Sequence, residues 1–127
     1  MDLSNIKTIA VVGVSNKPSR DSHMVAKYLM DAGFEVIPVN PKLEEFLGIK
    51  AYPDLLSIPA EKKVDIVNIF RKSSEVMPVI EKAIKIDAKS IWMQLGIVNE
   101  EAADVAKKAG LEVVMDQCIK IAHGCQK

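Results

Sequence analysis

The sequence predicts a doubly wound α/β fold: a parallel sheet of five strands with helices on both faces, in three α/β/α layers. Five apolar segments are continuous rather than alternating, which is typical of strands buried on both faces of a parallel sheet. Helical patterns of about ten residues separate these segments, as right-handed crossover connections require. We expect the strand order 3-2-1-4-5, counted along the chain, which would put a ligand crevice between the first and fourth strands.

The first half of this alternation extends to residue 39. Residues 8–13 form the first apolar segment, which ends at Gly13. Gly33 stands where the left-handed C-cap of the first helix belongs, and residues 34–39 form the second strand. Pro38 lies within that strand and predicts that its end is not fully paired. The first helix is predicted over residues 21–32 because one helical face carries Met24, Val25, Tyr28, Leu29 and Ala32.

The second half repeats the pattern. A short helix is predicted to open near Asp54, and a longer one near Ser73 or Ser74. Asn99 is a favourable N-cap for the last predicted helix, which Gly110 ends. The remaining strands are predicted at residues 64–70, 88–94 and 111–115. No element is predicted after residue 115, which we interpret as an irregular chain end.

The composition is that of one ordinary domain spanning residues 1–127. Hydrophobic residues make up 49% of the chain and charged residues 27%, which excludes a disordered protein. Seventeen Lys and Arg balance seventeen Asp and Glu, so the basic excess typical of nucleic-acid binders is missing and we expect no such partner. No apolar run reaches the roughly 18 residues of a membrane span, and the first residues lack a signal-peptide pattern. With only two cysteines, these features predict a cytoplasmic protein without a membrane partner.

The loops that follow the five strands meet at the carboxyl edge of the sheet, and they concentrate positive charge there. Because the whole chain is neutral, this excess predicts a compact anionic ligand with more than one phosphate. The cations are Lys17, Arg20, Lys42, Arg71 and Lys72, and the acids are Asp21 and Asp116.

The first of these loops has the mechanics of a phosphate-binding loop. Gly13 ends the strand where a side chain would obstruct close backbone approach. Ser19, Asp21 or Ser22 can cap the helix that follows, whose free N–H groups then face the crevice. The dinucleotide fingerprint G-x-G-x-x-G is not complete, because Ser15 stands where its second glycine would be.

The second loop also differs from that of an NAD site. Such a site places an acid after the second strand, where it holds a ribose hydroxyl. This chain has Asn40, Pro41 and Lys42 there instead. A lysine at this place favours a ligand with an additional phosphate on its ribose.

Six segments, in chain order, carry a resemblance to a known family: VVGVSNKPSRDSHMVAKYL, VIPVNPK, GIKAYPDL, VNIFRKSSEV, WMQLGI and GLEVVMDQCIKIAH. The chain resembles the small stand-alone CoA-binding proteins, whose Rossmann-like domain is similar to the N-terminal domain of the succinyl-CoA synthetase α subunit. The resemblance implies that CoA lies across the carboxyl ends of the strands. The histidine that the ligase phosphorylates belongs to a domain outside the resemblance.

The resemblance also implies which residues contact CoA. Ser15, Lys17, Arg20 and Ser22 would lie near its phosphates, and Lys42 stands where the synthetase domain has a CoA-contacting lysine. Phe70, Arg71, Leu95 and Gly96 would line the rest of the site. The complete set of candidate cofactor-binding residues is Gly13, Val14, Ser15, Lys17, Arg20, Ser22, Asn40, Lys42, Phe70, Arg71, Leu95 and Gly96.

Several of these residues also have a purely structural interpretation. Lys17 and Arg20 could be solvated loop charges, and Arg71 could bind a backbone carbonyl instead of a ligand. Phe70 is favoured as a core residue over one that stacks on a ligand, and so is Trp92, because both end buried strands. Asn40 could simply hold the turn before Pro41.

Neither a catalytic residue nor a metal site is predicted. His23 would need a positioned partner to act as a general base, and the sequence offers none. The spacing of Cys118, His123 and Cys125 matches none of the usual zinc patterns. Cys118 is interpreted as a small buried hydrophobe, with a reactive thiol as the alternative because CoA is itself a thiol.

These features predict a module that binds CoA or acyl-CoA without catalysis of its own. One alternative is a subunit of a CoA-dependent enzyme whose catalytic half is a separate chain. Another is a nucleotide-sensing regulator, since related Rossmann domains occur in redox-responsive repressors, although no basic helix-turn-helix precedes residue 8. The protein partner and the preferred acyl group stay open.

Overall fold

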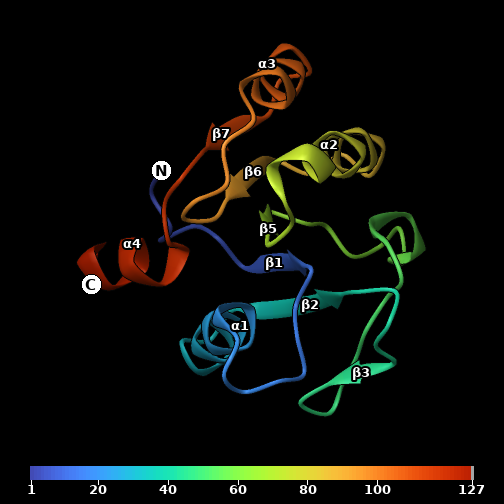
Figure 1. Ribbon diagram of the computed structural model, residues 1–127, viewed down its shortest axis with the longest axis vertical. Coiled ribbons are helices and arrows are strands. Elements are labelled where there is room, and N and C mark those ends of the chain that lie inside the picture. Colours follow the sequence, from blue (N-terminus) through green and yellow to red (C-terminus); the bar gives the residue numbers. More distant parts are fainter. Residues whose placement is uncertain (127) are drawn as a thin grey trace.

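The computed structural model describes residues 1–126, and it confirms the predicted fold class. Five parallel strands form one sheet in the order β2-β1-β5-β6-β7 (Figure 1). Helices cover both faces, which gives a three-layer, Rossmann-like α/β/α arrangement. The strands are β1 (Thr8–Val12), β2 (Glu35–Val39), β5 (Ile66–Ile69), β6 (Ser90–Met93) and β7 (Glu112–Val114).

The helices fall where the sequence predicts them, with one addition at the end of the chain. They are α1 (Asp21–Asp31), α2 (Val76–Lys85), α3 (Glu100–Lys108) and α4 (Ile119–Gln126), with single 3-10 turns η1 (Leu55–Ser57) and η2 (Ser73–Glu75). The Asn99 carboxamide oxygen accepts a hydrogen bond from the Ala102 N–H at 2.9 Å, as expected of an N-cap. No helix within residues 1–126 is long and apolar enough to cross a membrane.

The predicted strand order is wrong for the first three strands. The third strand along the chain, β5, pairs with β1, so β2 lies at the edge of the sheet. Pro38 explains this placement. Its carbonyl oxygen accepts the Tyr52 N–H at 2.9 Å on the side away from β1, so the N–H that proline lacks would also point outward. An interior strand needs donors on both sides, whereas an edge strand does not.

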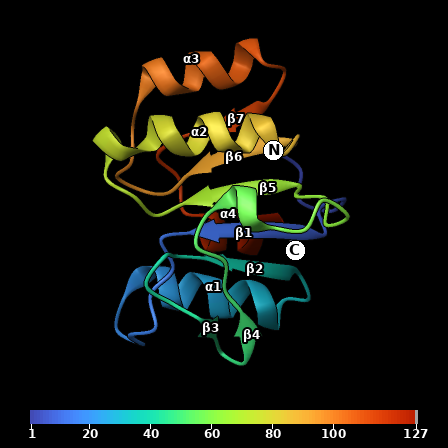
Figure 2. The same cartoon turned by 90° about the vertical axis from the view of Figure 1, so that its right-hand side faces the viewer.

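The corrected order moves the crevice. From β1 the chain crosses to β2 on one side, and it then returns to form β5 on the other side of β1. The strand order therefore reverses between β1 and β5, and not between β1 and β6, the first and fourth strands, as predicted. Ligands of doubly wound sheets bind outside the carboxyl ends of the strands at this point. In Figure 2 the strands run side by side with their carboxyl ends to the left, which is the side that faces the viewer in Figure 1.

Two apolar layers hold the sheet in place, one on each face. Strand residues alternate between them: Ile9 and Val11 face α1 and α4, whereas Ala10 and Val12 face α2 and α3. Trp92 lies on the α1 side and is only 1% exposed, which confirms its interpretation as core. Its indole N–H donates to the Gln117 carbonyl oxygen at 2.7 Å.

Two elements were not predicted. A small hairpin of β3 (Glu45–Phe46) and β4 (Ile49–Lys50) follows β2, and its turn places Leu47 at a positive φ of 49°. The chain end is not irregular, because α4 packs beside α1. There the Tyr28 hydroxyl and His123 Nδ1 lie 2.8 Å apart in a hydrogen bond. Ile121 of α4 and Cys118, which precedes this helix, lie near Gln94 and Leu95 at the carboxyl end of β6.

Candidate functional site

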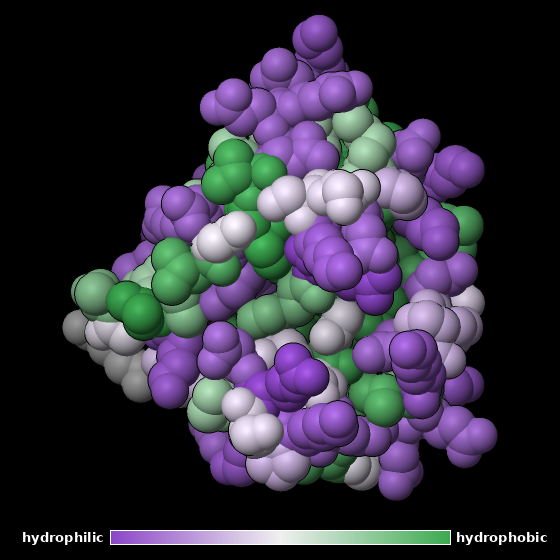
Figure 3. Space-filling view, viewed as in Figure 1, coloured by the Kyte–Doolittle hydropathy of each residue, from purple (hydrophilic) through white to green (hydrophobic). Residues whose placement is uncertain are grey.

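The cations predicted at the carboxyl edge lie in three neighbouring loops. Lys17 and Arg20 lie between β1 and α1, Lys42 follows β2, and Arg71 and Lys72 follow β5. Lys17, Arg20 and Lys42 are exposed, and none of them forms an ion pair within residues 1–126. These cations lie at the carboxyl edge of the sheet, on the face that Figure 3 views, where hydrophilic side chains are abundant.

Gly13 is the residue on which the two central loops converge. Its φ is +88°, a left-handed conformation, and its N–H donates to the Val39 carbonyl oxygen at 2.9 Å. A Cβ at this position would collide with the carbonyl oxygen of Phe70 and lie 3.1 Å from Cδ of Arg71. The absence of a side chain at Gly13 therefore allows the backbone after β5 to pack closely against the backbone after β1.

The loop after Gly13 is fastened from both sides. Asn40 donates from Nδ2 to the Val14 carbonyl oxygen at 2.8 Å, which ties the β1 loop to the end of β2. His23 Nδ1 lies 3.0 Å from the Ser15 carbonyl oxygen, and since a carbonyl only accepts, that nitrogen carries the proton. The His23 ring is also buried edge-on against Phe46. These contacts give His23 and Asn40 the role of holding the loop.

The start of α1 differs from the expectation that Ser19, Asp21 or Ser22 caps it. Arg20 occupies the N-cap position, and no side chain caps the helix. The hydroxyl of Ser22 instead accepts the Ser15 N–H at 3.0 Å, so it is used inside the loop. An uncapped helix start leaves N–H groups and the positive end of the helix dipole for an anion.

A pocket of about 580 Å³ lies directly over this helix start, at the junction of β1 and β5. It contains both free cations of the first loop, and its volume is within the range of small-molecule sites. The lining residues are Gly13, Ser15, Lys17, Ser19, Arg20, Asp21, Ser22, Phe70, Arg71 and Ile97. We call it the phosphate pocket.

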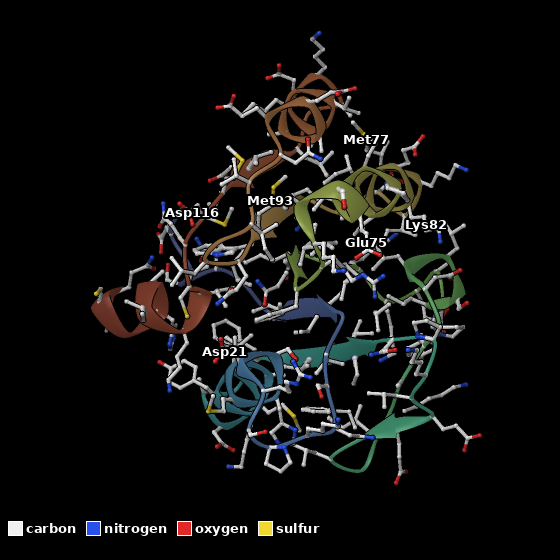
Figure 4. All side chains as sticks on the ribbon, in the orientation of Figure 1. Asp21, Glu75, Met77, Lys82, Met93 and Asp116 are labelled. Carbon is white, nitrogen blue, oxygen red and sulfur yellow. The ribbon has the colours of Figure 1, made fainter. Side chains whose placement is uncertain are left out.

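A second pocket, of about 380 Å³, adjoins the phosphate pocket on the α2 side. The two share Gly13 and Arg71. We call it the α2 pocket; its apolar wall is formed by Val12, Val39, Pro41, Pro53, Leu55, Pro78 and Val79. Polar side chains complete it, among them Glu75 and Lys82, which are labelled in Figure 4.

A third pocket, of about 350 Å³, adjoins the phosphate pocket on the α4 side. These two share Asp21, Phe70 and Ile97. We call it the α4 pocket; its lining is Asp21, Met24, Val25, Phe70, Gln94, Leu95, Ile97, Cys118, Lys120 and Ile121. The three pockets together make one groove across the carboxyl edge, in which Phe70 is half-buried and faces two of them.

Five of the candidate residues stand apart from the phosphate pocket, and one of them is Asn40, whose side chain fastens the β1 loop instead. Val14 is buried, and Lys42 is exposed beyond the α2 pocket, next to Pro41 in its wall. Leu95 belongs to the α4 pocket, while the Gly96 N–H donates to the Asp116 carboxylate at 2.7 Å.

Arg71 does not form the backbone carbonyl bond that the sequence left open, and it pairs with a carboxylate instead. Its guanidinium lies 3.0 Å from the Glu75 carboxylate, and the same side chain lines both the phosphate pocket and the α2 pocket. The ion pair is partly exposed, so it holds Arg71 only weakly.

Sequence reasoning missed the contribution of α4. Its apolar positions are few, and its residues line the groove only because α4 folds back beside α1. Cys118 is half-buried in the α4 pocket, and no group of three His, Cys, Asp or Glu within residues 1–126 is placed to hold a metal ion.

Comparisons with known proteins identify the family. The uncharacterized protein YneT of Bacillus subtilis is 49% identical over 98% of this chain and 91% of its own length. A solved structure, a hypothetical protein from Pyrococcus horikoshii, is 44% identical with a TM-score of 0.93, over 98% of this chain and 86% of the other.

A longer relative is the α subunit of the ADP-forming acetate–CoA ligase II of Pyrococcus furiosus, which is 31% identical over 94% of this chain. This chain spans only 28% of that subunit. The family model described as "CoA binding domain" matches residues 7–124. The chain therefore belongs to the CoA-binding domain family.

Proposed function

We propose that this protein binds CoA or acyl-CoA in the groove, without catalysis of its own. The observation that carries the proposal is the phosphate pocket, where Lys17 and Arg20 stand beside an uncapped helix start. A pyrophosphate placed there would gain charge-assisted hydrogen bonds from the side chains and from backbone N–H groups. The family supports CoA as the ligand that carries this pyrophosphate.

The chemistry of the other two pockets orients the ligand. The α2 pocket joins an apolar wall, suited to an adenine ring, to the end of β2, where Lys42 stands. CoA carries a 3′-phosphate on its adenosine ribose, and we assign that phosphate to Lys42. The pantetheine arm then extends the opposite way, into the α4 pocket, which is the less charged end of the groove.

Binding without catalysis is supported by the position of His23. A general base must lie within reach of its substrate. His23 lines none of the three pockets of the groove and is buried against Phe46. With both cysteines free, we also place the protein in the reducing cytoplasm.

A second candidate function is that of a subunit of a CoA-dependent ligase. The relative from Pyrococcus furiosus supports it, because the matched part of that α subunit is accompanied by a much longer remainder. Affinity purification from the native cell would detect a partner chain in stoichiometric amount. A ligase subunit would then form acyl-CoA only when that partner is present.

Competition titrations test the ligand assignment. Wild type should bind CoA at least about tenfold more tightly than dephospho-CoA, since a charge-assisted contact is worth roughly 1.5 kcal/mol or more. NAD should bind more weakly still. Lys42→Ala should narrow the difference between CoA and dephospho-CoA, whereas Lys27→Ala, which removes an exposed cation of α1 paired with Asp31, should not.

The same titrations can reject the proposal. Equal affinity for NAD and CoA would contradict CoA as the ligand. A difference between CoA and dephospho-CoA that persists in Lys42→Ala would assign the 3′-phosphate to another cation, with Arg71 the nearest candidate in the α2 pocket.

A further inference from the structure

The α4 pocket differs from the rest of the groove in its apolar rim. Leu95 is 64% exposed, Ile121 63% and Met24 44%, and all three line this pocket. Figure 3 shows hydrophobic side chains gathered between α4 and the loop after β6. Large apolar side chains grouped around a cavity of about 350 Å³ are typical of a surface that an apolar ligand or partner covers.

Two polar side chains of this pocket, Gln94 and Lys120, are engaged by the protein itself. Gln94 Oε1 accepts hydrogen bonds from Asn68 Nδ2 at 3.1 Å and from the Ile119 N–H at 3.3 Å. The Lys120 ammonium lies 5.6 Å from the centre of the Tyr28 ring, in a cation–π contact. The rest of the lining is mainly apolar: Met24, Val25, Phe70, Leu95, Ile97 and Ile121, with the Cys118 thiol beside them and the Asp21 carboxylate at the junction with the phosphate pocket.

The position of the pocket identifies its occupant. It opens directly into the phosphate pocket through Asp21, Phe70 and Ile97, so a molecule whose pyrophosphate binds at α1 can extend into it without a gap. The α2 pocket, on the other side, has Arg71 and Lys82, which pair with Glu75 and Asp54 of the same pocket, and it stands next to the exposed Lys42, which suits the charged adenosine end. The pantetheine arm of the same molecule therefore runs into the α4 pocket and brings the thioester to its apolar rim.

We infer that the α4 pocket is an acyl-chain site, and that the protein binds medium-chain acyl-CoA thioesters in preference to CoA itself. This inference rests on the proposed binding of CoA and adds to it the class of acyl group. A hydrocarbon chain would cover Leu95, Ile121 and Met24, and each methylene removed from water would raise the affinity by up to about fourfold.

The test is a calorimetric series with CoA, acetyl-CoA, hexanoyl-CoA and octanoyl-CoA on the folded protein. Affinity should rise along the series, with octanoyl-CoA at least about tenfold tighter than CoA. If CoA binds and octanoyl-CoA binds no better, the acyl-chain site is wrong and the proposed function stands. If none of the four binds, the proposed function itself is wrong.

A substitution at the rim of the α4 pocket tests where the acyl chain of the ligand lies. Ile121→Asp introduces a carboxylate at the rim of the pocket, on a side chain exposed enough for the fold to tolerate the change. It should reduce the ratio of octanoyl-CoA affinity to CoA affinity at least about fivefold, because the chain must then desolvate a charge. The matched control is Leu56→Asp in η1, 48% exposed and outside the groove, which should keep the wild-type ratio. An unchanged ratio in Ile121→Asp would place the chain elsewhere and overturn the inference.

Discussion

The amino and carboxyl edges of the central sheet, where the strands begin and end, differ in how their polar side chains are paired. At the amino edge the polar groups bind one another. The Asp65 carboxylate accepts the N–H groups of Lys7 and Thr8 at 2.9 and 3.0 Å and lies 3.3 Å from the Lys89 ammonium. Ser90 donates its hydroxyl to the Asp65 carbonyl oxygen at 2.6 Å. This edge is closed by its own hydrogen bonds.

At the carboxyl edge, hydrogen bonds also hold the backbone of the first loop, but cationic side chains of that loop are not paired with acids. Asn40, His23 and Ser22 fasten the first loop, while Lys17 and Arg20 in that loop form no ion pair within residues 1–126. Polar groups that satisfy one another stabilise a fold, and those held in place without partners are available to a ligand. Substitutions at the two edges should therefore separate stability from binding.

The largest effect is expected at Gly13, where both properties depend on one residue. Gly13→Ala should lower the free energy of unfolding by about 3–5 kcal/mol, because the left-handed φ and the collision with the Phe70 carbonyl add. CoA binding should fall with it as the β1 and β5 loops separate. Gly96→Ala is the control: its φ is +85°, but its Cβ would meet nothing within 4 Å, so about 1–2 kcal/mol should be lost. The free energies of unfolding are measured by chemical denaturation. Equal decreases in Gly13→Ala and Gly96→Ala would show that a Cβ at position 13 does not collide with the Phe70 carbonyl oxygen.

Asp65→Ala should affect stability alone. The substitution leaves the Lys7 and Thr8 N–H groups without an acceptor, and we expect the free energy of unfolding to fall by about 2–3 kcal/mol. CoA affinity of the folded variant should equal that of wild type. Asp31→Ala, which breaks only an exposed ion pair with Lys27, should cost about 0.5 kcal/mol or less. A loss of CoA affinity in folded Asp65→Ala would show that the two edges are not independent.

Arg20→Ala should affect binding alone. Loss of a charge-assisted bond to phosphate would weaken CoA binding on the order of tenfold to a hundredfold. Stability should change little, since the Arg20 side chain caps nothing and is exposed. Calorimetric titration of the folded variant measures the effect, with Lys27→Ala as the control cation on the same helix. Wild-type affinity in Arg20→Ala would mean that this guanidinium points into solvent.

A smaller effect is expected from acid at the amino edge. Burial raises the pKa of the Asp65 carboxyl, but hydrogen bonds from the Lys7 and Thr8 N–H groups and the Lys89 ammonium outweigh it and hold the pKa below its usual 3.8. A carboxyl with a depressed pKa contributes stability above its usual pKa and loses it as the pH falls through the folded value. Unfolding measured from roughly pH 5 to pH 3 should therefore show a steeper loss in wild type than in Asp65→Asn. Parallel curves would contradict this assignment.

The smallest effect, effectively none, is expected from reductant. Cys118 precedes α4 and Cys125 lies in its last turn, about 10 Å away along the axis, too far for a disulfide without unwinding the helix. Melting temperatures with and without reductant should agree within error. A large fall on reduction would contradict this expectation and indicate a redox role for the two cysteines.

Sequence reasoning predicted the elements of the central sheet well because their signals are local. Continuous apolar runs mark β1 and β5, and Asn99 marks the start of α3. The strand order failed because it depends on which side of β2 is left unpaired, and only the structure shows that the missing donor of Pro38 points outward. In the sequence, Pro38 predicts that one side of β2 is not fully paired but not which strand lies on the other side.

The candidate site divides in the same way. Gly13, Lys17 and Arg20 belong to one short segment of the sequence, so this part of the phosphate pocket could be predicted from a single loop. The α4 pocket joins Met24 of α1, Leu95 after β6 and Ile121 of α4, which only tertiary packing brings together. The Ser22 hydroxyl was expected to cap α1 but binds the Ser15 N–H, because that loop folds back over the helix start.

The most direct test is to map CoA binding on the two edges with backbone amide NMR spectra. On titration with CoA, the amide signals of Ser15, Lys17 and Ser22 should shift, together with those of Arg71 and Ile97 across the groove. The amide signals of Lys7, Thr8 and Lys89 at the amino edge should stay in place. Shifts confined to the amino edge, or no shifts at saturating CoA, would contradict a CoA site at the carboxyl edge.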